Sequence, residues 1–219
     1  MSENNNTKET LAVLFDFDGV LMDTESHYTE FWDTMGLKYT GQVGFGKTIK
    51  GQSLTHIFNT HFAGRDADQA EITKLLDTFE RDMPYEYIAG AEAFVRSLRP
   101  AGIRTAVVTS SNQVKMANVY RTHPEFKDMF DAILTSEDFS RSKPDPECFL
   151  AAMQRLGVDA RHSVVFEDSL FGLEAGRKSG AKVVALATTN PREVVAPLAD
   201  MVIDDFTQMN VEAVEKLLR

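Results

Sequence analysis

Four short apolar runs constrain the fold of this chain more than any other feature. Each is too short for a helix, and three contain paired valines, which is typical of parallel strands buried on both faces of a sheet. Two shorter runs, at residues 132–134 and 201–203, are further strand candidates. The four main runs cover residues 11–17, 104–109, 163–167 and 182–187.

Helical patterns lie between these runs. Residues 91–98 carry an apolar face, and residues 170–178 form a second short helix that ends at Gly180. Asp145 is placed to cap a further helix, with Pro146 at its first position. Strand and helix in alternation predict an α/β fold, a three-layer Rossmann-like core with a parallel sheet covered on both faces. In such sheets, ligands bind at the carboxyl ends of the strands.

The alternation breaks between the first and second runs. Residues 24–88 show helical periodicity and no convincing strand, so we expect a small α-helical cap domain inserted after the first strand. The catalytic core would then comprise residues 1–23 and 89–219. An insertion at this point lies over the carboxyl edge of the sheet, where a lid would lie.

Two of the predicted strands end in pairs of acids. Asp16 and Asp18 follow the first strand on one side of an extended segment, and Glu167 and Asp168 end the third of the four long runs. Close carboxylates repel unless a cation lies between them or one is protonated. Taken alone, the first pair is equally typical of a solvated turn, and the second of acids at a helix N-terminus.

The other strand ends carry hydroxyl groups and a lysine. Thr109, Ser110, Ser111 and Asn112 follow the second long run, and this polar turn predicts either an anion-binding site or an ordinary helix cap. Lys143 precedes a proline, which favours an extended backbone that aims the ammonium group. A lone lysine in this context is more often a surface residue.

The order of these features along the chain is more specific than any one of them. An acid pair, a hydroxyl turn, a lysine and a second acid pair on successive strand ends resemble the four motifs of the haloacid dehalogenase-like (HAD) phosphatase superfamily. The stretch from Asp16 to Glu25, DFDGVLMDTE, is similar to the first motif of its subgroup of β-phosphoglucomutase and sugar-phosphate phosphatases. The third and fourth motifs resemble SKPDP at 142–146 and FEDSLFG at 166–172.

This resemblance implies a covalent mechanism. Asp16 would attack phosphorus and form an aspartyl phosphate, while Asp18 would hold a proton for the leaving oxygen and later activate water. The Thr109 hydroxyl and the Ser110 amide would hold phosphoryl oxygens, and Lys143 would neutralise negative charge.

The resemblance also implies Mg²⁺ as cofactor. Its ligands would be Asp16, the backbone carbonyl of Asp18, and Asp168, with Glu167 binding directly or through water. Oxygen ligands and a substrate phosphate are typical of Mg²⁺ sites.

Substrate choice is expected to lie in the cap, where Glu25 and Lys50 are candidate contacts beside the polar turn residues Ser110, Ser111 and Asn112. The family mutase has a cap histidine and a cap arginine that gate the catalytic acid and hold the second phosphate, and it carries a lysine on a later cap helix. The best-matching positions here are Tyr28 for the histidine, with His27 one place away, Leu54 for the arginine and residues 79–81 for the lysine. We therefore expect a Mg-dependent phosphatase of small sugar or metabolite monophosphates, with a hexose-phosphate mutase as the alternative.

The composition of the chain limits the classes of partner that it is expected to bind. The net charge of −10 does not favour nucleic acid or an anionic membrane, and no apolar run is long enough to span a bilayer. Cys148 is the only cysteine, which excludes an intrachain disulfide and fits a cytoplasmic location. We expect a monomer that binds a small phosphorylated metabolite. A non-catalytic binding module on the same fold is the third class, and the intact acids count against it.

Overall fold

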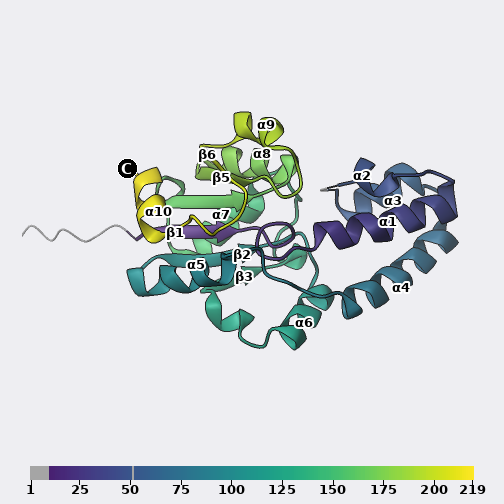
Figure 1. Ribbon diagram of the computed structural model, residues 1–219, viewed down its shortest axis with the longest axis horizontal. Helices are drawn as coiled ribbons and strands as arrows, with labels where there is room; N and C mark the ends of the chain where they lie inside the picture. Colours follow the sequence, from purple (N-terminus) through teal and green to yellow (C-terminus); the bar gives the residue numbers. More distant parts are fainter. Residues whose placement is uncertain (1–9, 51) are drawn as a thin grey trace, which may run out of the picture.

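A six-stranded sheet forms the centre of the computed structural model, which describes residues 10–50 and 52–219 (Figure 1). The strand order is β3-β2-β1-β4-β5-β6, and every neighbouring pair is parallel. All six predicted strands are present, although the first is shorter than expected. Their bounds are β1 Ala12–Phe15, β2 Arg104–Val108, β3 Ala132–Leu134, β4 Ser163–Glu167, β5 Lys182–Leu186 and β6 Met201–Ile203.

Helices cover both faces of this sheet, which confirms the three-layer prediction. Alternate side chains of β1 point to opposite faces: Val13 and Phe15 join one buried cluster, and Leu14 joins another. The first face is covered by α5 (Ala91–Leu98), α6 (Gln113–Thr122) and α10 (Val211–Leu217). The second is covered by α7 (Glu147–Leu156), α8 (Leu170–Ser179) and α9 (Arg192–Val195).

Short 3₁₀ turns join several of these elements, at Arg99–Ala101, Phe126–Met129, Ser136–Asp138, Ala160–His162 and Ala196–Leu198. One predicted helix start was wrong by one residue. Helix α7 begins at Glu147 with Pro146 as its N-cap residue. Asp145 lies one position farther out, where its carboxylate accepts a hydrogen bond from the Glu147 backbone N–H at 3.0 Å.

The segment between β1 and α5 forms four helices with their own buried cluster. These are α1 (Glu25–Thr40), α2 (Phe45–Thr48), α3 (Leu54–His61) and α4 (Asp66–Asp82), and they project away from the sheet (Figure 1). Helix α2 is short and was not predicted. The cluster includes Phe31 and Trp32.

The two connections of this helical segment to the sheet run side by side. The Asp23 N–H donates to the Glu86 carbonyl at 2.8 Å, and the Ile88 N–H donates to the Leu21 carbonyl at 2.9 Å. The chain therefore leaves and re-enters the core at one place.

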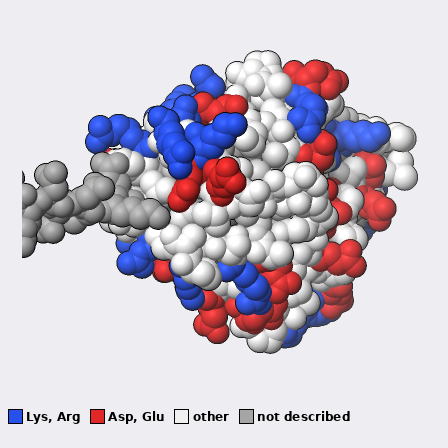
Figure 2. All heavy atoms as spheres, turned by 60° about the vertical axis from the view of Figure 1, so that its left-hand side comes forward, with Lys and Arg blue, Asp and Glu red and all other residues white. Residues whose placement is uncertain are grey.

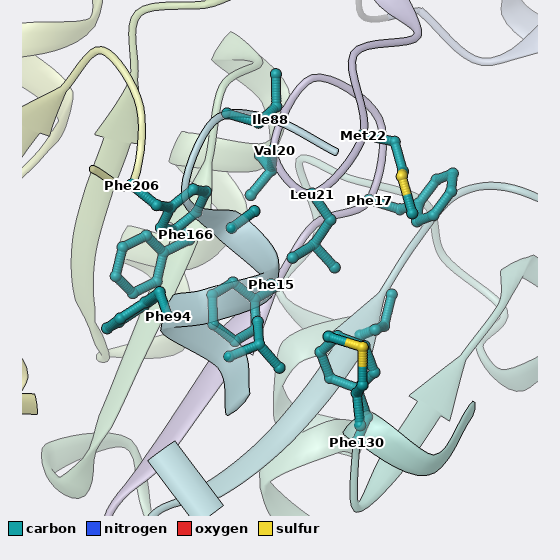
Figure 3. Close-up of a cluster of buried hydrophobic side chains, with 14 of the residues drawn as sticks. Phe15, Phe17, Val20, Leu21, Met22, Ile88, Phe94, Phe130, Phe166 and Phe206 are labelled. Carbon is teal, nitrogen blue, oxygen red and sulfur yellow. The ribbon is translucent and has the colours of Figure 1, made fainter. Parts of the chain in front are cut away.

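Aromatic rings from β1, β4 and α5 pack together in the buried cluster on the first face of the sheet (Figure 3). The rings of Phe15 and Phe166 stack at 5.2 Å, and those of Phe94 and Phe206 stack at 5.5 Å. Phe15 precedes Asp16, and Phe166 precedes Glu167. Because truncating such a buried ring to alanine typically costs about 3–5 kcal/mol, this packing fixes the backbone from which the acids project.

The surface carries charges of both signs. On the face turned away from the helical segment, basic and acidic side chains intermingle around a broad uncharged area (Figure 2). None of the helices in residues 10–50 and 52–219 has the length and apolar character needed to span a membrane.

Candidate active site

Asp16 lies at the carboxyl end of the central strand and pairs with Lys143. The β1–β4 ladder continues through its backbone N–H, which donates to the Phe166 carbonyl at 3.0 Å. The Lys143 ammonium donates to Asp16 at 2.5 Å, to Glu167 at 2.7 Å and to the Val108 carbonyl at 3.2 Å. All three ammonium protons therefore have acceptors, and the side chain is 8% exposed. Lys143 is thus a buried site residue and not the surface lysine that its local sequence alone would favour.

Glu167 and Asp168 complete a buried acidic group at this edge. Carboxylate oxygens of Asp16, Glu167 and Asp168 lie within 4.8 Å of one another. One Glu167 oxygen accepts from Lys143, while the other accepts from the Asp168 and Ser169 backbone N–H groups at 2.9 and 3.0 Å. Glu167 is therefore already engaged in hydrogen bonds, which favours a water-mediated role at a metal over direct ligation.

Two glycines allow these acids to approach the backbone closely. A Cβ at Gly172 would lie 1.8 Å from a Glu167 oxygen, and a Cβ at Gly19 would lie 2.2 Å from an Asp168 oxygen. Gly19 also has φ +73°, a conformation that favours glycine. The Asp-Gly step of the first motif is therefore explained by both backbone angle and space.

The three carboxylates fit a hard divalent cation. Burial raises the pKa of Asp16 to about 7, with further contributions from Glu167 and Asp18 that Lys143 only partly offsets. The pKa of Asp168 is also raised well above its usual range, by burial and by the charges of Glu167 and Asp16. A cation such as Mg²⁺ relieves this repulsion, and its preferred ligands are the oxygens present here.

The hydroxyl turn borders the same edge. Thr109 is buried, and its hydroxyl accepts a hydrogen bond from the Ser111 N–H at 3.0 Å. Ser110 is exposed. The Asn112 side chain caps α6 by accepting from the Lys115 N–H at 2.8 Å, so the helix-cap interpretation of this residue holds in the structure.

The surroundings of Asp18 differ from expectation. Its carboxylate is contacted by Lys115, a residue that the sequence analysis did not single out. The Lys115 ammonium lies 2.5 and 2.7 Å from its two oxygens, Thr24 donates at 2.6 Å and Ser111 donates at 2.9 Å. Although burial raises the pKa of Asp18, the charge and hydrogen bonds of Lys115 and the two hydroxyl groups bring it below its ordinary value. These contacts favour the ionised form of Asp18, whereas the family resemblance implies that it holds a proton during the reaction.

A single protein-family model covers all the strand ends that carry these side chains. A family model described as haloacid dehalogenase-like hydrolase matches residues 13–186. The chain belongs to the haloacid dehalogenase-like hydrolases. Solved HAD structures share its fold: a family IA hydrolase from Entamoeba histolytica has a TM-score of 0.82 at 23% identity, covering 95% of this chain and 99% of that one. A β-phosphoglucomutase from Clostridium difficile has a TM-score of 0.77 at 20% identity, covering 95% and 97%.

Curated relatives of this HAD chain include enzymes of two activities. A validoxylamine A 7'-phosphate phosphatase from Streptomyces hygroscopicus subsp. limoneus is 30% identical, covering 90% of this chain and 95% of the relative. A fructose-1-phosphate phosphatase from Escherichia coli is 27% identical, covering 79% and 94%. A β-phosphoglucomutase from Mycobacterium bovis is also 27% identical, covering 90% of both chains. Both activities that the sequence left open therefore occur among relatives of similar identity.

The cap side of the HAD site contains the two substrate-binding candidates. Glu25 is the first residue of α1, and half-buried Lys50 follows α2. Burial and the charge of Asp18 raise the pKa of Glu25 to about 7, while Lys50 opposes this rise. The charges of Asp18 and Lys50 therefore both act on the Glu25 carboxyl group.

Sequence reasoning also missed a polar segment after β5. Thr189 donates a hydrogen bond to an Asp168 oxygen, Asn190 donates to the Asp168 carbonyl at 3.0 Å, and Thr188 donates to the Gly19 carbonyl at 2.6 Å. The run Thr-Thr-Asn directly after a fifth strand was the available signal, since it repeats the hydroxyl-rich character of the turn after β2.

Proposed function

We propose that this HAD enzyme is a Mg²⁺-dependent phosphatase that hydrolyses monophosphates of small sugars or related metabolites. The reaction would pass through an aspartyl phosphate at Asp16. The observation that carries the proposal is the buried Asp16 carboxylate at the tip of the central strand, held by Lys143 within a cluster of acids. The family and the phosphatases among its relatives support phosphoric monoester hydrolysis.

In this proposal, Asp16 is the nucleophile and Lys143 orients it. The free oxygen of Asp16 attacks phosphorus, while Lys143 offsets the negative charge of both carboxylate and phosphate. The Thr109 hydroxyl and the exposed Ser110 amide hold phosphoryl oxygens, with Ser111 and Asn112 shaping the turn around them.

The acid cluster would hold the proposed cation. Asp16, Asp168 and the Asp18 carbonyl would hold Mg²⁺, with Glu167 contributing through water. When bound, the ion supplies positive charge that stabilises the transferring phosphoryl group. The raised pKa values of Asp16 and Asp168 support this assignment.

Asp18 transfers the protons in this scheme. It gives a proton to the leaving oxygen and then takes one from the water that attacks the aspartyl phosphate. Because Lys115 favours the ionised form of Asp18, this carboxylate would acquire its proton in the substrate complex, where the phosphate charge raises its proton affinity.

The cap favours a phosphatase over the alternative, a β-phosphoglucomutase-type isomerase. Tyr28 occupies the position matched to the mutase's cap histidine, and its hydroxyl donates to Glu80 at 2.7 Å. Glu80 lies in the stretch matched to the mutase's cap lysine. A carboxylate in place of that ammonium disfavours a second phosphate. We therefore assign residues 24–88 to a cap that selects monophosphates, with Glu25 and Lys50 as substrate contacts.

The test is a screen of phosphate monoesters with Mg²⁺, followed by Asp16→Asn. The variant should lose turnover by about 10³-fold or more because the covalent step is removed. Asp77→Asn, the same change at an exposed position of α4, is the matched control. Near-normal kcat in Asp16→Asn would exclude aspartyl catalysis.

A second assay separates phosphatase from mutase. Glucose 1-phosphate is supplied with a trace of glucose 1,6-bisphosphate, and free phosphate and glucose 6-phosphate are followed over time. We expect free phosphate without any bisphosphate requirement. Rapid formation of glucose 6-phosphate with almost no free phosphate would establish the mutase instead.

A further inference from the structure

The buried ammonium of Lys115 has no role in the reaction proposed above. Its side chain is 5% exposed, and its ammonium contacts both oxygens of Asp18 at 2.5 and 2.7 Å. Lys115 belongs to the first turn of α6, where Asn112 fixes its backbone N–H. The pair therefore joins the helix after β2 to the loop after β1.

Two cap helices form the other side of the Lys115 site. The ammonium lies 4.6 Å from the ring centroid of Tyr28 in α1 and 5.5 Å from that of Phe17. The Tyr28 hydroxyl is in turn held by Glu80 of α4 at 2.7 Å. Lys115 is thus enclosed by the core on one side and by α1 and α4 on the other.

The remaining surroundings of Asp18 are acidic. The negative charge of Asp18 acts on both Asp16 and Glu25, which also carry carboxylates. Besides Lys115, the side chains that hydrogen-bond to Asp18 in the described part of the chain are two neutral hydroxyls, Thr24 and Ser111. A neutral side chain in place of Lys115 would leave this carboxylate repelled by its acidic neighbours and held by the two hydroxyl groups alone.

We propose that Lys115 is a positioning residue that fixes the orientation of the Asp18 carboxylate, and that the Tyr28–Glu80 pair of the cap keeps Lys115 in place. The inference deepens the proposed function and rests on it. The two buried lysines then have separate roles. Lys143 orients the nucleophile, and Lys115 orients the proton-transfer group.

The experiment compares two leaving groups in Lys115→Met. Release of a sugar from its monophosphate needs a proton from Asp18, whereas release of p-nitrophenolate needs little assistance. The sugar ester is glucose 6-phosphate, or the sugar phosphate that the screen above turns over fastest. Single-turnover release of the sugar should slow by about 30-fold or more, within the range of general acid catalysis. Release of p-nitrophenolate should slow by less than about 5-fold, and KM for either ester should change little.

Matched variants distinguish a positioning role of Lys115 from a nonspecific disturbance of the structure. Lys127→Met removes an exposed lysine that also lies over a ring, that of Tyr120 at 4.1 Å, and should leave both rates unchanged. Removing Lys115 in an Asp18→Asn background should add little to the loss already caused by Asp18→Asn, because the two residues act as one unit. Tyr28→Ala should give the same leaving-group dependence as Lys115→Met, in weaker form.

The possible results distinguish failure of this inference from failure of the proposed function. Wild-type rates in Lys115→Met, faster sugar release, or equal losses on both esters would overturn the inference while leaving the phosphatase intact. Failure of the wild type to hydrolyse either ester would overturn the proposed function and this inference together. Should Lys115→Met not fold, Lys115→Arg keeps the charge but shifts the donors. Unequal losses on the two esters in that variant would support the inference, and equal losses or none would reject it.

Discussion

Removing the Asp16 carboxylate should stabilise the metal-free protein. A rise in the pKa of Asp16 from 3.8 to about 7 corresponds to roughly 4 kcal/mol of ionisation cost at pH 8, at about 1.4 kcal/mol per pKa unit. This cost already includes the attraction of Lys143, which lowers the pKa of Asp16. Asp16→Asn avoids the cost, so the variant should gain up to about 4 kcal/mol, equivalent to about 8–16 °C in Tm for a chain of this size.

The pH dependence has a defined sign. Below about pH 4 Asp16 is protonated in both the folded and the unfolded state, so the advantage of the variant vanishes. As pH rises to about 7 the unfolded carboxyl ionises while the folded one resists, and wild-type stability falls relative to the variant. The variant's advantage should thus grow between about pH 4 and pH 7 and then level off.

Thermal unfolding in EDTA and in Mg²⁺ measures both effects, with Asp77→Asn as the control for the loss of one acid. Saturating Mg²⁺ should remove this advantage, because an ion at 1,000 times its Kd stabilises the wild type by about 4.1 kcal/mol and the variant much less. An Asp16→Asn protein that is less stable than wild type in EDTA at pH 8 would refute the argument that the acids repel one another.

Three further outcomes are expected. Chelation should abolish hydrolysis and Mg²⁺ should restore it, whereas Ca²⁺ should inhibit because its larger coordination shell misplaces the phosphate; full activity after exhaustive chelation would exclude the metal. Gly172→Ala should displace the Glu167 carboxylate and lower kcat by about 10-fold or more, as a 1 Å misplacement can cost 10²-fold, and an unchanged kcat would mean that Glu167 is not needed in place. Glu25→Gln and Lys50→Met should raise KM for sugar phosphates several-fold more than for p-nitrophenyl phosphate, as measured by initial rates. Equal changes in KM for both esters would show that these two residues do not take part in substrate recognition.

The sequence predicted the core of the site because its signals are local. Each acid or hydroxyl follows an apolar run directly, and parallel strands bring their carboxyl ends to one edge. The order of residues along the chain is therefore enough to place Asp16, Thr109 and Glu167 together. Lys143 required the family resemblance, since its own surroundings favoured a surface position.

The contacts of Asp18 could not be predicted in this way. Lys115 lies 97 residues away along the chain, in a helix whose pattern gives no hint of which side chain reaches the neighbouring loop. The available signal was electrostatic. A lysine in the first turn of a helix is disfavoured by the helix dipole, so its presence there indicates a specific acidic partner. The hydrogen bonds and charge that lower the pKa of Asp18 were missed for the same reason.

The paired connections of the helical segment have a consequence for how this enzyme can diversify. Because the chain leaves the core at Asp23 and returns at Glu86 through one hydrogen-bonded pair, the ends of the intervening segment are adjacent. Insertions with adjacent ends are tolerated without disturbing the host domain. Residues between these points can therefore be lengthened, shortened or exchanged for another fold while the strand ends keep their arrangement. New specificities can arise by replacing one contiguous piece of the gene, with the reaction chemistry inherited unchanged.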